Sequence, residues 1–424
     1  MTFAFSGNDT GGVGIDHFGC SIDKSEFVTC TSPFTSPRPL KDGNHTFRVL
    51  SEDKVANKDS SPASFNWTVD TSAPNTKIDS ATDGNKSTVT NDGNTKSTSM
   101  TFAFSGNDTG GVGIDHFGCS IDKSEFVTCT SPYRLPQSLK DGVHTFSVLS
   151  EDKVGNKDPS PASLSWTVDT VAPYTKIDSA TDGNKSAITN GASTKSTSMT
   201  FAFSGNDTGG VGIDHFGCSI DKSEFVTCTS PFTYSKSFKD GIHTFRVLSE
   251  DKVANKDQSP ASLSWTVDTV APSTRIDSAT DGNKSSIING GNSSSNSAII
   301  MFSGLDSGGN SGKGVGINHF ECSLDGASFS NCSAPLKINK LKDGTHTVEL
   351  RASDNVGNKD SSPASLSWTV DTAPPSTSIT SVLDGKRNIV AAGGNTTSTS
   401  MVFTLSGNDT GIGLDHFECS LDGA

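Results

Sequence analysis

The chain consists of near-identical copies of one segment of about a hundred residues. Residues 7–33 recur without change at 106–132 and at 205–231. Trp67, Trp166, Trp265 and Trp368 then mark the same point of four successive copies, 99 residues apart for the first two steps and 103 for the third. A longer stretch at 305–313 accounts for the wider third step. A period of this length is typical of tandem domains, so each copy is expected to fold around its own core.

The copies predict five domains, and the two outer ones are expected to be incomplete. Met1 matches the internal residues Met100 and Met199, so the first domain lacks its first strand, and the last stops in mid-copy at Ala424. We therefore expect a fragment of a longer protein, in which a missing signal peptide says nothing about location. The predicted domains are 1–71, 72–170, 171–269, 270–372 and 373–424.

Apolar residues alternate with polar ones along several short segments of each copy. Met100, Phe102 and Phe104 fall on one side of a two-residue period, as do Leu164, Trp166 and Val168 near the end of the same copy. This period is that of a half-buried strand. With turn signals such as Asp141-Gly142 between the segments, each copy predicts a seven-stranded β-sandwich, and the chain an all-β row of such beads.

The cysteines occur as four pairs, each ten residues apart, and one further residue, Cys419. Zinc sites usually place two cysteines two to four residues apart, whereas ten residues across a hairpin suit a disulfide. Each bridge would contribute about 2–3 kcal/mol, and buried free thiols are the alternative. Disulfides indicate an oxidising, extracytoplasmic compartment. The predicted pairs are Cys20–Cys30, Cys119–Cys129, Cys218–Cys228 and Cys322–Cys332.

Charge and hydropathy narrow the range of partners. The net charge is −14, so the chain lacks the basic excess that a nucleic-acid partner requires. No run of about 18 apolar residues is present, so no membrane span is expected in this fragment.

Three segments of the second copy carry a resemblance to known proteins. LKDGVHTFSV at 139–148, SEDKVGNKD at 150–158 and SPASLSWTVDTVAP at 160–173 resemble tandem immunoglobulin-like and fibronectin type III-like repeats of bacterial and archaeal cell-surface proteins. The resemblance covers essentially the whole chain. It implies a secreted, cell-surface adhesin, stalk, coat or filament component.

Acidic and amide residues are predicted to meet where one copy joins the next. In a sandwich of this topology, two loops lie at the end where the chain enters, next to the last residue of the preceding copy. Calcium binds six to eight oxygens from such groups, and related surface repeats hold calcium at domain junctions. The alternative is that these residues only form turns. The candidate ligand sets are Asp70, Asp108, Asp152, Asn156 and Asp158; Asp169, Asp207, Asp251, Asn255 and Asp257; and Asp268, Asp306, Asp354, Asn358 and Asp360.

No motif for catalysis stands out, so the chain is predicted not to be an enzyme. It lacks GxSxG and HExxH, and its Gly-rich DTGGVG has no following Lys to cradle phosphate. His116 and His144 recur once per copy, which fits structure better than one active site; His144 occupies the place of a tyrosine that bridges a strand corner in related sandwiches. Asn8, Asn107 and Asn206 lie in Asn-x-Thr sequons and are candidate glycosylation sites.

Three classes of function remain open. The leading hypothesis is an extracellular stalk, fibre or coat component, because near-identical copies suit a spacer whose length is set by copy number. The second is an adhesin whose beads bind a cell-surface protein or glycan. The third is a spacer region of a large secreted enzyme. Self-association of beads through strand edges into fibres or a layer is a further expectation.

Overall fold

The computed structural model describes residues 1–308 and 314–422, and the regular elements in those ranges are β-strands. This confirms the all-β fold predicted from the two-residue period. Residues 309–313 of the long stretch at 305–313 lie outside the described residues. Within the described ranges, no helix is long and apolar enough to cross a membrane.

The chain separates into two compact units. One comprises Met1–Thr175, Gly205–Phe216 and Leu248–Ser259, and the other Lys176–Ser204, Gly217–Val247 and Pro260–Ala424. The second repeat, 72–170, lies wholly in the first unit, and the fourth, 270–372, wholly in the second.

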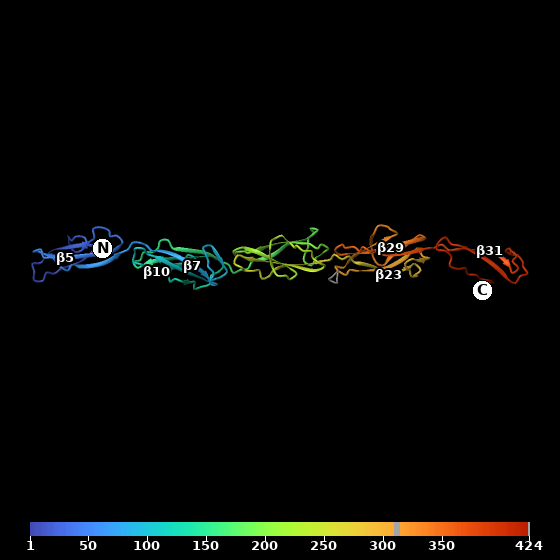
Figure 1. Ribbon diagram of the computed structural model, residues 1–424, viewed down its shortest axis with the longest axis horizontal. Coiled ribbons are helices and arrows are strands. Elements are labelled where there is room, and N and C mark those ends of the chain that lie inside the picture. Colours follow the sequence, from blue (N-terminus) through green and yellow to red (C-terminus); the bar gives the residue numbers. More distant parts are fainter. Residues whose placement is uncertain (309–313, 423–424) are drawn as a thin grey trace. The chain divides into compact units, whose positions relative to one another are not determined.

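The second repeat is a sandwich of two sheets (Figure 1). The larger sheet has the order β11-β10-β13-β14-β8 and the smaller one β12-β9-β7. Neighbouring strands are antiparallel except β8, which runs parallel to β14. The strands are β7 (Asn75–Asp83), β8 (Gly93–Thr95), β9 (Met100–Asn107), β10 (Ile114–Ile121), β11 (Val127–Cys129), β12 (Tyr133–Arg134), β13 (Gly142–Asp152) and β14 (Ala162–Val168).

The core between these sheets is built from the alternating residues. Met100, Phe102 and Phe104 of β9 are at most 3% exposed, as the period predicts. Phe102 stacks on Phe146 of the opposite sheet, with ring centroids 3.9 Å apart. Trp166 packs against the Phe102 ring, with ring centroids 5.4 Å apart. Aromatic burial of this kind holds the two sheets together.

The fourth repeat has the same two sheets with a different core. Its sheet orders are β24-β30-β29-β26-β27 and β23-β25-β28. Ile300 and Val348 occupy the places of the stacked pair Phe102 and Phe146, and both are fully buried. A sandwich tolerates such exchanges when the core remains filled. The strands are β23 (Ser273–Asp281), β24 (Gly291–Ser293), β25 (Ala298–Leu305), β26 (Ile317–Leu324), β27 (Ser330–Cys332), β28 (Leu336–Ile338), β29 (Gly344–Asp354) and β30 (Ala364–Val370).

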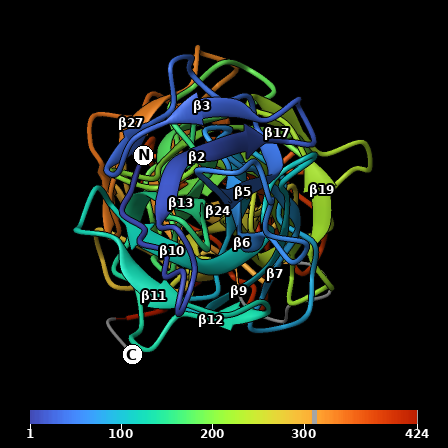
Figure 2. The same cartoon turned by 90° about the vertical axis from the view of Figure 1, so that its left-hand side faces the viewer.

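The remaining copies contribute further sheets of the same kind. In the first, β2 and β5 lie side by side in the sheet β3-β2-β5-β6, as the end-on view shows (Figure 2). The third copy has the sheets β15-β17-β20 and β16-β22-β21-β18-β19, and the last has β31 paired with β32. Their strands are β1 (Thr2–Phe3), β2 (Ile15–Ile22), β3 (Val28–Cys30), β4 (Phe34–Thr35), β5 (Gly43–Asp53), β6 (Ala63–Val69), β15 (Tyr174–Asp182), β16 (Ser193–Thr194), β17 (Met199–Asn206), β18 (Ile213–Ile220), β19 (Val226–Cys228), β20 (Phe232–Thr233), β21 (Gly241–Asp251), β22 (Ala261–Val267), β31 (Ser376–Asp384) and β32 (Met401–Asn408).

Candidate metal sites at the repeat junctions

Three strand ends place an aspartate at the point where the second repeat begins. Asp70 directly follows β6, the last strand of the first repeat, and Asp108 directly follows β9. Asp152 is the last residue of β13 and pairs with Ile114 at the start of β10. Because β9 and β13 end at the same end of the sandwich, their terminal carboxylates lie beside the incoming chain.

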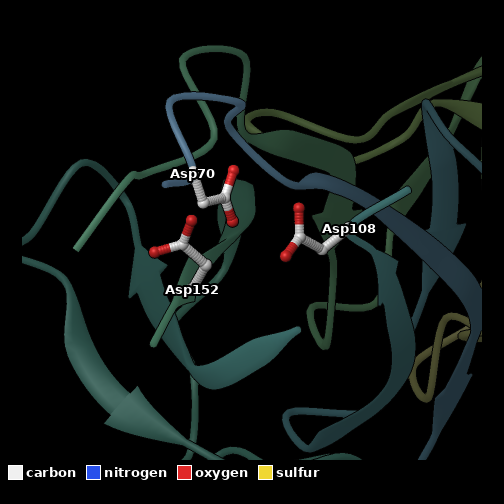
Figure 3. Close-up of side chains that lie close together, drawn as sticks. All are labelled: Asp70, Asp108 and Asp152. Carbon is white, nitrogen blue, oxygen red and sulfur yellow. The ribbon is translucent and has the colours of Figure 1, made fainter. Parts of the chain in front are cut away.

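The three carboxylates form a triad (Figure 3). One oxygen from each lies within 4.8 Å of the others. The same triad recurs twice more in the described residues, as Asp169, Asp207 and Asp251 and as Asp268, Asp306 and Asp354. Each takes one carboxylate from the end of a repeat and two from the repeat that follows.

Backbone amides hold the carboxylates of the first triad in place. Val112 donates its N–H to Asp70 Oδ2 at 2.8 Å, and Gly113 donates to Asp108 Oδ2 at 2.7 Å. The pKa of Asp152 is lowered, because hydrogen bonds from the following loop outweigh the effect of burial, which acts in the opposite direction. Asp152 is therefore an anion at neutral pH.

The triads contain negative charge without a matching cation among the described side chains. Asp108 Oδ1 and Asp306 Oδ1 are buried and have no hydrogen-bond partner. Burial raises the pKa of Asp207, and the nearby carboxylates Asp169 and Asp251 raise it further. The pKa of Asp306 is raised in the same way. Like charges held together in partly buried positions repel one another, and a bound cation would remove that repulsion.

A glycine beside each triad leaves space next to the oxygens. A Cβ at Gly111 would overlap the carboxylate oxygens of Asp108 and Asp70. Gly210 is placed in the same way at the second triad, and a Cβ at Gly314 would overlap the Asp306 carboxylate of the third. The donors are all oxygens, which suits a hard cation such as Ca²⁺ or Mg²⁺ better than zinc.

The other two members of each predicted ligand set have different contacts. Asn156 donates its side-chain N–H to Asp152 Oδ2 at 2.7 Å and to the Asp70 carbonyl at 3.1 Å. Asp158 accepts the Thr76 N–H at 2.7 Å and the Ser160 N–H at 2.9 Å. The structure thus brings the carboxylates of Asp70, Asp108 and Asp152 around one point. Asn156 hydrogen-bonds both to this triad and to the incoming chain, and Asp158 binds the incoming chain. Asn255 and Asn358 repeat the first arrangement, and Asp257 repeats the second.

Four disulfides lie away from the triads. They join Cys20 to Cys30, Cys119 to Cys129, Cys218 to Cys228 and Cys322 to Cys332, each with Cα atoms 5.8 Å apart. In the second repeat the bridge joins β10 to the edge strand β11. Cys419 is free and exposed.

The histidine at position 144 is a bridge between two turns. Its Nδ1 lies 2.7 Å from Asp122 Oδ2 and its Nε2 lies 2.8 Å from the Lys140 carbonyl oxygen. These two hydrogen bonds raise the pKa of His144 although burial acts against them. The resemblance to related sandwiches implied a strand corner at this residue, and the structure adds its two acceptors, which lie 22 and 4 residues away in the sequence.

The candidate glycosylation sites are exposed. Asn8, Asn107 and Asn206 all have exposed side chains. Asn107 donates its side-chain N–H to Thr109 Oγ1, the hydroxyl of its own sequon, at 2.7 Å.

The fold is that of tandem immunoglobulin-like sandwiches, and several solved structures are detectably similar to the chain. No protein-family model matches the chain, and no curated protein matches its sequence. The tetra-tandem repeat in the extending region of a large adhesion protein is 16% identical, with a TM-score of 0.33, over 85% of this chain and 93% of that one. A Ca²⁺-stabilised adhesin with which an Antarctic bacterium binds ice is 16% identical, with a TM-score of 0.31, over 87% and 92%. Fibronectin(III)-like modules of Clostridium thermocellum CbhA are 14% identical, with a TM-score of 0.26, over 45% and 93%. Similarities this distant say nothing of what the chain does.

Proposed function

We propose that this chain is a structural region of an extracellular cell-surface protein, a stalk, fibre or coat component in which Ca²⁺ stiffens the junctions between repeats. The observation that carries the proposal is the composition of the triads. Each joins one carboxylate of a finished repeat to two of the next. An ion bound by all three would connect neighbouring repeats directly.

The chemistry of the triads favours Ca²⁺ as the ion. Three carboxylates supply up to six oxygens, and Ca²⁺ accepts six to eight at 2.3–2.6 Å in flexible geometry. Asp70, Asp108 and Asp152 would hold the ion at the first junction, and the missing side chain of Gly111 leaves space beside their oxygens. Without the ion, the unpartnered oxygen of Asp108 remains buried among other carboxylates.

The cysteines support an extracellular location, since disulfides persist in oxidising compartments. Each complete repeat contains one disulfide and its own aromatic or aliphatic core, so we propose the boundaries 72–170, 171–269 and 270–372 for the complete domains, flanked by 1–71 and 373–424. Glycans on Asn8, Asn107 and Asn206 are part of the same proposal. A spacer of this kind needs no catalytic residues.

The test compares the whole chain with and without Ca²⁺ by calorimetry and by solution X-ray scattering. A ligand present at a hundred times its Kd stabilises a folded domain by about 2.7 kcal/mol, so Ca²⁺ should raise the melting temperature and a chelator should reverse the shift. Scattering should report a smaller maximum dimension in chelator, because the junctions loosen.

Two variants, each lacking three carboxylates, distinguish loss of the metal sites from a general effect of reduced negative charge. Asp108→Asn, Asp207→Asn and Asp306→Asn together should abolish both responses to Ca²⁺. Asp79→Asn, Asp178→Asn and Asp277→Asn remove three carboxylates outside the triads and should leave the responses intact. If the first set still responds to Ca²⁺ like the native chain, the junction sites are wrong.

A further inference from the structure

One position beside the triads differs in charge between the repeats. It directly follows the last aspartate of each triad, and it is a lysine at the first two junctions and an asparagine at the third. At all three junctions its backbone N–H donates to a glycine carbonyl of the loop before the second strand of the larger sheet, so the position is structurally the same. The residues are Lys153, Lys252 and Asn355, bonded to Gly113, Gly212 and Gly316 at 3.2, 3.2 and 3.0 Å.

The glycine loop that this position contacts is the loop that binds the triad. At the first junction the Val112 N–H donates to Asp70 Oδ2 at 2.8 Å, and the Gly113 N–H donates to Asp108 Oδ2 at 2.7 Å. The backbone of Lys153 therefore anchors a loop that holds two of the three carboxylates, one from each of the neighbouring repeats.

The ammonium of Lys153 lies against the same loop. A Cβ at Gly113 would be 3.8 Å from Lys153 Nζ, and a Cβ at Gly212 would be 3.7 Å from Lys252 Nζ. Together with the bond from the Gly113 N–H and standard backbone bond lengths, this places Lys153 Nζ at most about 9 Å from Asp108 Oδ2. The ammonium thus contacts the loop rather than taking the place of a metal ion, and its charge still acts at the triad.

The third junction keeps the contact with the loop and loses the charge. The side-chain N–H of Asn355 donates to the Val315 carbonyl at 2.8 Å, and the Val315 N–H donates to Asp268 Oδ2 at 3.0 Å. A neutral amide therefore binds the loop where the first two junctions have an ammonium.

The other lysine of the same segment does not differ in this way. It is paired with a glutamate at each junction, so its charge is offset in all three repeats. The pairs are Lys157 with Glu151 at 3.3 Å, Lys256 with Glu250 at 3.1 Å and Lys359 with Glu321 at 2.9 Å.

We propose that Lys153 and Lys252 are tethered cations that compete with Ca²⁺ for the first and second triads, and that Asn355 leaves the third triad without a competitor at this position. An ion that enters the first triad is repelled by the nearby ammonium, because like charges repel. The inference rests on the proposed function, in which the triads bind Ca²⁺. The first two junctions should then fill only at a higher Ca²⁺ concentration, and their affinity should depend on ionic strength.

The test measures the affinity of the first junction alone, by calorimetric titration of the whole chain with Ca²⁺. Asp207→Asn and Asp306→Asn disable the other two triads. In this background Lys153→Gln should lower the Kd for Ca²⁺ about fivefold at about 0.01 M ionic strength, the factor for a single and a double charge about 9 Å apart in water. At about 0.15 M, where the Debye length is about 8 Å, the difference should shrink to less than about twofold.

Two variants in the same background control for charge and for shape. Lys157→Gln removes an equal charge from the same segment, but its ammonium contacts Glu151 rather than the glycine loop, so the Kd should change much less. Lys153→Arg keeps the charge and should keep the native affinity at both ionic strengths.

The third junction offers the reverse exchange, in a chain that carries Asp108→Asn and Asp207→Asn. Asn355→Lys and Asn355→Met both lose the bond to the Val315 carbonyl, and only the first adds a charge. The lysine variant should bind Ca²⁺ about fivefold more weakly than the methionine variant at low ionic strength. Because both variants share the longer stretch at 305–313, that stretch does not affect the comparison.

The two proposals can fail separately. Equal affinities of Lys153→Gln and its parent chain at low ionic strength would overturn the competition and leave the junction sites intact, as would a gain in affinity that salt does not reduce. A native chain that binds no Ca²⁺ at any ionic strength would overturn the proposed function itself.

Discussion

Removal of the disulfides should destabilise every complete repeat by an amount that follows from the length of the loop they close. Each bridge joins residues ten apart. For a loop of this size the chain-entropy relation gives about 2.7 kcal/mol at 25 °C, because the cross-link removes conformations from the unfolded chain. In a domain of about a hundred residues this corresponds to a fall in melting temperature of roughly 10–20 °C.

The assay is calorimetry of the oxidised chain, the chain reduced with its thiols intact, and a variant with all eight paired cysteines changed to alanine. Reduction removes the cross-link and leaves the sulfur atoms in the core. The alanine variant also leaves small cavities, because Cys119 is 1% and Cys129 7% exposed, so it should melt below the reduced chain. Free thiols in the native chain, or a reduced chain that melts within 3–4 °C of the oxidised one (roughly, less than the shift expected for 1 kcal/mol), would refute the reasoning.

Four further outcomes are expected. His144→Gln should lower the free energy of unfolding more at pH 5.5 than at pH 8.5, because hydrogen bonds to the Lys140 carbonyl and Asp122 raise the pKa of His144. The stability that this histidine contributes is present below about pH 6.5 and is lost as the pH rises through its folded-state pKa. Equal losses at both pH values in urea unfolding would contradict this. Glu321→Gln should destabilise the fourth repeat at pH 6 but not at pH 1.5, because neighbouring Lys and Arg side chains hold the pKa of Glu321 at about 2. The stability that Glu321 contributes is present above about pH 4.5 and is lost as the pH falls through its folded-state pKa. Acid titration followed by circular dichroism measures this. Gly111→Ala should remove one Ca²⁺ site and spare the other two, counted by calorimetric titration, since its Cβ would overlap the triad oxygens. Phe146→Leu should cost about 1–2 kcal/mol in the second repeat because this fully buried ring stacks on its partner, and thermal melting would show no change if the stack contributed nothing.

The fold could be predicted because its signals are local. The alternation at Met100, Phe102 and Phe104 predicts a half-buried strand from neighbouring residues alone, and exact repetition predicts that the same solution recurs. The short strand β8 had no such signal. Gly93, Asn94 and Thr95 are ordinary turn and linker residues, and they form a strand only because β14 offers an open edge beside them.

The residues of the candidate metal site were selected from equally local signals. Asp70, Asp108 and Asp152 could be selected because they follow predicted strand ends at a junction. The same reasoning selected Asn156 and Asp158, which are equally frequent in turns and lie in the same loop. Asn156 hydrogen-bonds to the Asp152 carboxylate as well as to the Asp70 carbonyl, and Asp158 accepts the Thr76 N–H. These contacts depend on which groups the folded loop and the incoming chain present.

The amino-acid sequence by itself therefore determined the repeat, the strand period, the cysteine spacing and the acidic character of the junctions, because each is a pattern within about ten residues or an identity between copies. The tertiary structure decided which three carboxylates share a point, which acceptors His144 bridges, and that Asp169 serves two repeats at once. Those outcomes depend on groups up to 86 residues apart, whose meeting is set by the packing of whole sheets rather than by any local preference.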